Sequence, residues 1–321
     1  MRKIAITGVA SRFARVLLPL LEADPEIEQI VGIDLVPPVG TYNKLAFYQR
    51  DVRDPCLEEL FSGCDCLVHL AFIVGRPCSM SLQEAASINL AGTWNTCHAA
   101  AQAGVRKLVV SSSVSAYGSL PDNPDPLVEE SPLRGLYTTF YYSQHKHANE
   151  IWLDGFQLAF PHLLISRLRP CIVIGPNQFA TANLIQSNLA HFTTKEAYQG
   201  CLQLIHEDDL ASAFFACVKY DLPGAYNVVA DGSDSLPNIA AAAGLEVIEV
   251  PSELIVQATT VAWEEGTSPI GPEWVEGEDS IFCSHALLCS NAKFKATGAW
   301  TPCYSTTQAF AVTVAALTSS P

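Results

Sequence analysis

The sequence predicts an α/β protein with a doubly wound parallel sheet, and two patterns support this prediction. In the first half of the chain, short apolar β-type runs alternate with longer helical patterns, as expected for parallel strands joined by crossover helices. Beyond Pro170 the alternation loosens, which indicates a smaller second domain. The expected strands are residues 4–7, 30–34, 46–49, 67–71, 108–111 and 163–167, and the expected helices are residues 12–23, 55–61, 81–103 and 141–158.

The second half is expected to form a smaller C-terminal α+β domain. Residues 202–219 predict a strand followed by a helix, and residues 225–229 predict another strand. The acidic segment 246–279 differs in composition from the first half. We therefore expect a first domain of residues 1–170, to which 203–230 return, and a second domain of residues 171–202 and 231–321.

Composition excludes several classes of protein. The chain of 321 residues has 18 basic and 33 acidic side chains, a net charge of −15 that argues against binding to nucleic acid or to an anionic membrane. With 49% hydrophobic and 16% charged residues, disorder is excluded as the dominant state. Eleven cysteines without paired or metal-ligand spacing favour buried free thiols in a reducing cytoplasm, with no metal site. The apolar run 309–317 is too short to span a bilayer.

The first strand ends in the loop Thr7-Gly8-Val9-Ala10-Ser11-Arg12-Phe13-Ala14, directly before a helix. A dinucleotide needs a tight turn at such a junction, where its pyrophosphate meets backbone N–H groups at the helix N-terminus. The usual three-glycine pattern is altered here, because Ser11 and Ala14 stand at the second and third positions. Ser11 is therefore either part of a phosphate-binding loop or an ordinary helix N-cap.

Asp34 ends the second strand, 26 residues after Gly8. A carboxylate at this point can accept hydrogen bonds from the adenosine ribose diol and repels a 2′-phosphate, which favours NAD over NADP. The alternative is a turn aspartate before Pro37-Pro38. Arg12 is the opposing observation, since a basic residue in the loop can pair with a 2′-phosphate, and NADP stays open.

A candidate catalytic pair lies on the helix expected at 141–158. Tyr142 and Lys146 are four residues apart and so share one helix face. A neighbouring ammonium lowers the pKa of a phenol and makes it a usable acid or base. Ser111, Ser112 and Ser113 end the preceding strand at the carboxyl edge of the sheet, where open α/β sheets bind ligands. Ser113 is placed to hydrogen-bond a reacting oxygen.

These residues, in this order, resemble the extended short-chain dehydrogenase/reductase superfamily, with its Rossmann-type fold and its NAD-dependent sugar epimerases, dehydratases and hydroxysteroid-type dehydrogenases. The resemblance covers almost the whole chain and rests on Thr7-Gly8, Asp34, Asp51-Val52, Val68–Ala71, Asn89 with Gly92-Thr93, Ser111–Ser113 with Tyr117-Gly118, Tyr142 and Lys146, Arg169-Pro170 with Gly175-Pro176, His206 with Asp208-Asp209, Tyr226–Val228, and Gly298–Trp300 with Pro302.

The resemblance implies roles for individual residues. Ser113, Tyr142 and Lys146 would be catalytic. The cofactor would be NAD, with contacts from Gly8, Ser11, Arg12, Phe13, Asp34, Asp51 and Val52 on its adenosine and pyrophosphate side, and from Leu70, Ala71, Ser111, Tyr142, Lys146, Pro170 and Ile172 on its nicotinamide side.

Several other polar residues have ordinary structural interpretations. His69 is expected in the core, His145 and His147 at the surface, and Asp208 and Asp209 at the start of a helix. Asn89 is expected to hold water or backbone near the site, or to pack its helix. Arg76 is a cation expected near the mouth of the pocket.

The substrate is predicted from charge. The last arginine is Arg169, and Leu202 stands at about the place where sugar-nucleotide members of the superfamily carry an arginine. Diphosphates are usually held by guanidinium groups, so we expect a carbonyl or alcohol substrate without a diphosphate. Phe179, Phe192, Trp263 and Trp274 either line a pocket for it or form ordinary core. The alternatives are a nucleotide-sugar epimerase or dehydratase and a non-catalytic dinucleotide sensor; a homodimer is the expected assembly.

Overall fold

The centre of the molecule is a seven-stranded parallel sheet. The structure is a computed structural model that describes residues 2–178, 192–193, 201–245, 247–249, 251–268, 270–274 and 285–319. The strand order is β10 (Gly224–Val228), β6 (Leu164–Pro170), β5 (Lys107–Ser111), β4 (Cys66–His69), β1 (Arg2–Thr7), β2 (Ile27–Asp34) and β3 (Leu45–Gln49). Because all neighbours are parallel, the carboxyl ends of the strands meet at one edge.

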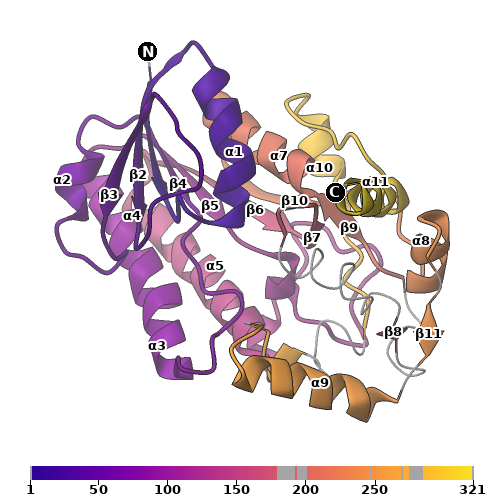
Figure 1. The fold of residues 1–321 in the computed structure, drawn as a ribbon. Coiled ribbons are helices and arrows are strands. Elements are labelled where there is room, and N and C mark those ends of the chain that lie inside the picture. The colour runs from indigo at the N-terminus through magenta and orange to yellow at the C-terminus, as the bar shows by residue number, and fades with distance from the viewer. Residues whose placement is uncertain are drawn as a thin grey trace.

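Helices cover both faces of this sheet (Figure 1). One hydrophobic cluster joins the sheet to α1 (Arg12–Ala23) and α7 (Glu207–Lys219). A second cluster joins the opposite face to α2 (Leu57–Phe61), α4 (Thr93–Gln102) and α5 (Tyr141–Ala159). The predicted doubly wound α/β fold is confirmed, and each predicted strand of the first half has a counterpart in the sheet.

The helix predicted at residues 81–103 is not one regular α-helix. It consists of α3 (Leu82–Ala86), a π-helical turn η1 (Ser87–Gly92) and α4. The wider turn contains the buried Asn89, whose side-chain amide bonds both the N–H and the carbonyl of Ile73. Short π-helical turns of this kind are often found at functional sites.

The second half adds a smaller lobe at the carboxyl edge of the sheet (Figure 1). Two short parallel pairs join β7 (Ile172–Ile174) to β9 (Leu204–His206) and β8 (Phe192–Thr193) to β11 (Ile248–Glu249). The lobe also holds α8 (Leu236–Ala242), α9 (Ser252–Glu264), the 3₁₀ turn η5 (Pro272–Trp274), α10 (Ala292–Ala296) and α11 (Thr306–Thr318). The exact division of the chain into two domains stays a prediction.

Two expectations from composition can be compared with the described residues. Six of the ten described cysteines are buried, whereas Cys56, Cys78, Cys201 and Cys303 are exposed, so the expectation of buried thiols is only partly met. In the described part of the chain, no helix is both long and apolar enough to cross a membrane.

Candidate active site

Gly8 forms the tight turn between β1 and α1. Its φ of 74° is a left-handed conformation that favours glycine. A Cβ atom at this position would lie 2.5 Å from the backbone nitrogen of Ala71 and 2.7 Å from the carbonyl carbon of Leu70. The loop after β1 and the backbone after β4 therefore approach as closely as glycine permits, which brings together three of the predicted cofactor residues.

Ser11 is the N-cap of α1. Its hydroxyl accepts a hydrogen bond from the backbone N–H of Ala14 at 3.2 Å. The N–H groups of Arg12 and Phe13 lie in the first turn, where a helix offers them no internal acceptor. These N–H groups give the N-terminus of the helix a partial positive charge beside the loop, which favours the binding of a phosphate. The N-cap interpretation of Ser11 is thus confirmed, and it is compatible with a phosphate-binding loop.

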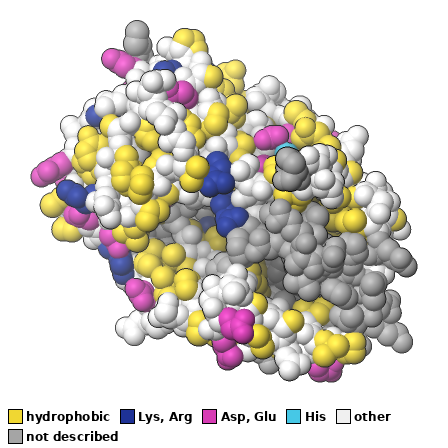
Figure 2. Space-filling view, in the orientation of Figure 1, with side chains coloured by type: hydrophobic (Ala, Val, Ile, Leu, Met, Phe, Trp, Pro, Cys, Tyr) yellow, Lys and Arg dark blue, Asp and Glu magenta, His cyan; other side chains and the backbone are white. Residues whose placement is uncertain are grey.

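Arg12 and Arg15 are exposed on the first turn of α1. Arg12 donates to the carbonyl oxygen of Asn177 at 3.2 Å, beyond β7. Burial, together with the nearby Arg15, lowers the pKa of Arg12, while Glu207 opposes this shift. Figure 2 shows Lys or Arg side chains at the rim of a hollow, in the region where Figure 1 places this end of α1.

Asp34 ends β2, and Asp51 follows the neighbouring strand β3. The carboxylate of Asp34 accepts hydrogen bonds from the backbone N–H groups of Ala10, at 2.9 Å, and Leu35, at 2.7 Å. It therefore braces the glycine loop and keeps lone pairs for further donors. The carboxylate of Asp51 pairs with Arg53 at 2.6 Å, which lowers the pKa of Asp51.

The candidate catalytic hydroxyls lie together at the carboxyl edge. Ser113, two residues after β5, accepts a hydrogen bond from the N–H of Ser115 at 3.1 Å and donates to the carbonyl oxygen of Pro170 at 3.4 Å. Tyr142 comes from the first turn of α5 and hydrogen-bonds Ser113. Burial raises the pKa of the Tyr142 phenol to about 12, although the contact with Ser113 lowers it in part.

Lys146 lies one turn further along α5. Its ammonium donates to the carbonyl oxygen of Ser111 at 2.8 Å and lies 3.5 Å from the ring centroid of Phe72 and 5.6 Å from that of Tyr142. Burial lowers the pKa of Lys146 to about 7, and Glu150 opposes this shift. The expected lowering of the Tyr142 phenol pKa by this ammonium is not found, because burial raises that pKa and the opposing contribution comes from Ser113.

The remaining predicted contacts frame the same edge. Val52 is buried after β3, against Gly92, where an added Cβ would lie 2.5 Å from a Val52 methyl group. Phe13 packs against the core cluster beneath α1. Pro170 ends β6 and Ile172 begins β7, so both lie on the chain that leads from the sheet to the second lobe.

Aromatic side chains form a wall around Tyr142. Phe140, Tyr141, Tyr142 and Trp274 are one buried cluster, against which Phe72 and Ile270 pack. The Trp274 ring centroid lies 5.5 Å from that of Tyr142. Trp263 lies elsewhere, with its ring 4.7 Å from the guanidinium of Arg76. Of the four proposed pocket residues, Trp274 therefore borders the site, while Phe179 and the side chain of Phe192 lie outside the described residues.

Two surface predictions were wrong. His145 and His147 are buried on α5 rather than exposed. His145 lies 3.2 Å from the Asn89 amide and 5.6 Å from the ring centroid of Tyr141, so packing against η1 and the aromatic cluster covers it. Burial lowers the pKa of His145 to about 4, as does the charge of Lys146.

The other structural interpretations are close to what is found. His69 is buried between the hydroxyls of Thr7 and Thr93, at 2.7 and 2.9 Å. Asp209 lies in the first turn of α7, although the N-cap itself is His206. Asn89 holds backbone, as expected.

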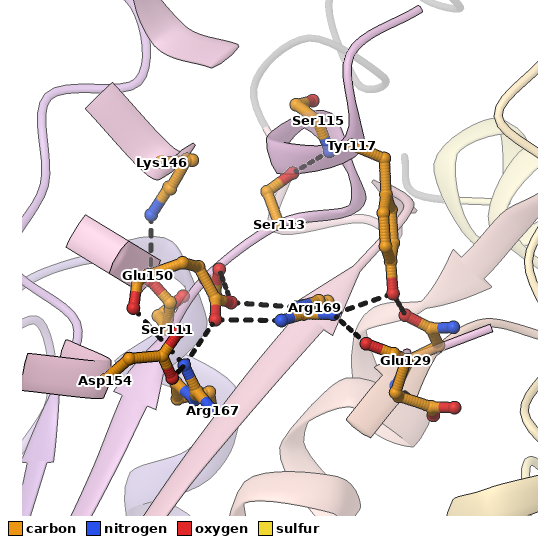
Figure 3. A network of polar contacts seen from close by, with 12 residues as sticks. Ser111, Ser113, Ser115, Tyr117, Glu129, Lys146, Glu150, Asp154, Arg167 and Arg169 are labelled. Carbon is orange, nitrogen blue, oxygen red and sulfur yellow. Dashed lines mark hydrogen bonds and ion pairs between the residues drawn. The ribbon is translucent and has the colours of Figure 1, made fainter. Parts of the chain in front are cut away.

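Sequence reasoning missed Glu150, Arg167 and the polar network of Figure 3. Glu150 forms two short contacts with Arg169, between Nε and Oε1 at 2.8 Å and between Nη2 and Oε2 at 2.9 Å. The available signal was the spacing, because Glu150 follows Lys146 by four residues on the same helix.

Known proteins agree with this fold. The sequence profile of the NAD dependent epimerase/dehydratase family matches residues 4–228. The chain belongs to this family. The predicted superfamily is confirmed, and with it an NAD-dependent enzyme family of the extended short-chain type.

Individual relatives are distant. An uncharacterized protein of Mycobacterium tuberculosis is 24% identical over 259 residues, which cover 77% of this chain and 67% of that protein. The enzyme WbmH of Bordetella bronchiseptica, crystallised in complex with NAD+, has a TM-score of 0.73 at 19% identity and 99% coverage of both chains. UDP-N-acetylglucosamine 4-epimerase from Methanobrevibacter ruminantium M1, in complex with UDP-N-acetylmuramic acid, has a TM-score of 0.75 at 17% identity and covers 98% of this chain and 97% of its own. Identities this low show a shared fold.

Proposed function

We propose that the protein is an NAD-dependent oxidoreductase that transfers a hydride between the cofactor and a carbonyl or alcohol substrate without a diphosphate. The observation that carries the proposal is the meeting of the Ser113 hydroxyl, the Tyr142 phenol and the Lys146 ammonium at the edge of the sheet next to the Gly8 loop. A family of NAD-dependent enzymes provides the matching chemistry.

The residues present fit NAD. The close approach of Gly8 to Ala71 leaves a side-chain-free surface beside the N-terminus of α1, where the N–H groups of Arg12 and Phe13 and the cap Ser11 would hold the pyrophosphate. Asp34 would accept from the adenosine ribose, with Asp51 and Val52 nearby. Leu70, Ala71, Ser111, Pro170 and Ile172 would border the nicotinamide half. NAD is favoured over NADP, because Asp34 is a carboxylate and Arg12 is engaged by Asn177.

Each catalytic residue has one task. Ser113 donates a hydrogen bond to the substrate oxygen and fixes its position. Tyr142 takes the hydroxyl proton when an alcohol is oxidised and returns it when a carbonyl is reduced. Lys146 would hold the nicotinamide ribose, and its positive charge stabilises the phenolate of Tyr142 during the transfer. NAD, when bound, supplies the hydride acceptor.

Charge supports a substrate without a diphosphate. In the described part of the chain after Arg169, the three lysines are all paired with carboxylates: Lys219 with Asp24 and Glu26, Lys293 with Glu130, and Lys295 with Asp231. The wall beside Tyr142 is aromatic instead. A compact apolar carbonyl or alcohol fits such a wall.

A nucleotide-sugar epimerase is the second candidate, because the Methanobrevibacter neighbour has this activity and shares the fold. A non-catalytic dinucleotide sensor is disfavoured by the assembled Ser113, Tyr142 and Lys146. A location in the cytoplasm and a homodimeric assembly stay predictions. The molar mass of the protein in solution tests the homodimer.

The test is to incubate the protein with NADH, and separately with NADPH, and a panel of aliphatic and aromatic ketones, following cofactor oxidation. A parallel panel of UDP-sugars with NAD is analysed for epimers. Ketone-dependent oxidation of NADH is the expected result. Epimer formation without net cofactor turnover would replace the proposal with the epimerase, and cofactor binding with no turnover in either panel would favour the sensor.

A further inference from the structure

Lys146 and Glu150 hold consecutive residues at the end of β5. They lie one turn apart on α5 and are 3% and 1% exposed. Lys146 donates to the carbonyl oxygen of Ser111 at 2.8 Å (Figure 3). Glu150 accepts from the hydroxyl of Ser112 at 2.6 Å. The next residue is Ser113. The pair therefore fixes α5, which carries Tyr142, against the strand end that carries its partner.

Glu150 is itself held as a carboxylate. Arg169 forms a two-pronged contact with it, and Arg167 lies 3.1 Å from its second oxygen. Although burial opposes ionisation, the hydrogen bonds and charge of Arg169 lower the pKa of Glu150. Arg169 in turn donates to the Tyr117 hydroxyl at 2.8 Å and to the carbonyl oxygen of Glu129 at 3.0 Å. In Figure 3 Glu150 lies between Lys146 and this arginine.

Lys146 has few charged neighbours. It borders a small cavity whose lining in the described chain includes His69, Asn149 and Glu150, and Glu150 is the one carboxylate among these lining residues. From β4 and α5, His69 and His145 have pKa values lowered by burial to about 3 and about 4, so both are neutral near pH 7. The cations on β6, Arg167 and Arg169, contact the Glu150 carboxylate and are not among the residues that line the cavity.

We propose that Glu150 is a positioning residue for the reaction: its carboxylate, held by Arg169, stabilises the ammonium form of Lys146, which lies beside the Tyr142 ring. A buried ammonium is costly without an opposite charge, and the phenol and aromatic rings around Lys146 supply none. Without Glu150, Lys146 would lose its proton more readily. The phenolate of Tyr142 would then lose the positive charge that stabilises it. The effect on catalysis rests on the proposed function, whereas the effect of Glu150 on the charge of Lys146 does not.

The electrostatic part can be measured without a substrate. Competitive acetylation, read by mass spectrometry across about pH 5 to 10, gives the pKa of Lys146 in each variant. Glu150→Gln removes the charge and keeps the shape, and Glu150→Asp keeps the charge. The double variant Glu150→Gln/Arg169→Gln removes both charges of the pair, so that no buried guanidinium is left alone. Asp154→Asn is the matched control, because it removes an exposed carboxylate of the same network one turn further along α5.

In the wild type we expect a midpoint at about pH 7. Glu150→Gln and the double variant should lower it by roughly one unit or more, whereas Glu150→Asp and Asp154→Asn should stay close to the wild type. The proposal is overturned by an unchanged midpoint in the folded double variant, or by a decrease in Glu150→Asp as large as in Glu150→Gln. If the single variant does not fold, the double variant and Glu150→Asp decide.

Cofactor titration separates this inference from the proposed function. If the wild type binds NAD, Glu150→Gln should weaken the binding more at pH 8 than at pH 6, and Asp154→Asn should not change it. A wild type that binds no NAD would refute the proposed function, while the acetylation midpoints would still decide whether Glu150 stabilises the ammonium.

Discussion

At the scale of single residues, the burial of Tyr142 determines how strongly its phenolate must be stabilised by neighbouring groups. The phenol is 9% exposed and is surrounded by Phe72, Phe140 and Trp274. Such surroundings disfavour a phenolate; in the described part of the chain, Ser113 hydrogen-bonds the phenol and the Lys146 ammonium lies 5.6 Å from its ring centroid. Any oxidation at this site therefore depends on these two partners.

Replacement of Tyr142 by phenylalanine removes the proton carrier and keeps the ring. We expect kcat to fall by roughly 10²–10⁴-fold, with little change in the affinity for NAD. Tyr141→Phe is the matched control, since its phenol belongs to the same aromatic cluster but donates to the carbonyl oxygen of Val74. Full turnover by the Tyr142 variant, or an equal loss in the Tyr141 variant, would show that another group moves the proton.

Gly8→Ala tests the close approach of the two loops. The new methyl group would clash with the backbone of Ala71. It would also strain the backbone, because Gly8 has a left-handed conformation with a φ of 74°. Gly63→Ala is the control, because Gly63 has a φ of 73° and open space where its Cβ would lie. We expect the control to lose about 1–2 kcal/mol of stability and Gly8→Ala to lose more, together with NAD binding. Denaturant unfolding and cofactor titration measure the two effects, and equal losses would show that the contact is not tight.

At the scale of elements, sequence periodicity predicts the strands and α5 well but not the turn η1. One wide turn hardly alters a helical pattern, so residues 81–103 look continuous. The burial of His145 was also beyond prediction, because it depends on packing against elements distant in sequence. The four-residue spacing predicted that Tyr142 and Lys146 share a helix face, and the same spacing joins Lys146 to Glu150, but the ion pair of Glu150 with Arg169 from β6 depends on the fold.

Ser11 shows how a local signal can have two readings. As an N-cap, its replacement by alanine should cost about 1 kcal/mol and its replacement by glycine only a few tenths. Ser305→Ala removes the cap of α11, far along the chain, and should cost a similar amount. If the loop binds NAD mainly through backbone N–H groups, Ser11→Gly should bind NAD as tightly as the wild type does. Ser305→Ala, whose change lies far from the loop, should do the same. A large loss of NAD binding in Ser11→Gly, measured by titration, would instead assign the hydroxyl a direct contact with the cofactor.

At the scale of the whole molecule, the two halves differ in charge. The arginines all lie at or before Arg169, and the chain carries a net charge of −15. Acidic side chains gather over α9 in Figure 2, whereas Lys or Arg side chains line the rim of the hollow. The first half therefore carries the positive charge that a cofactor would need, and the described part of the second half adds Trp274 to the aromatic cluster and carries lysines paired with carboxylates.

This distribution predicts that nucleotide-sugars do not bind. Charge-assisted hydrogen bonds contribute about 1.5–3 kcal/mol each, and a diphosphate would lack the guanidinium groups that usually donate them. With NAD present, we expect UDP, UDP-glucose and dTDP-glucose at millimolar concentration to leave the melting temperature unchanged, while NAD itself raises it. A ligand present at 100 times its dissociation constant would add about 2.7 kcal/mol of stability, a shift of a few degrees that such an experiment detects easily. A shift of that size with any of the three nucleotides would contradict the prediction. The diphosphate would then be held by Lys195, by backbone N–H groups or by arginines of the first half. In that case a nucleotide-sugar epimerase would be the better description of this site.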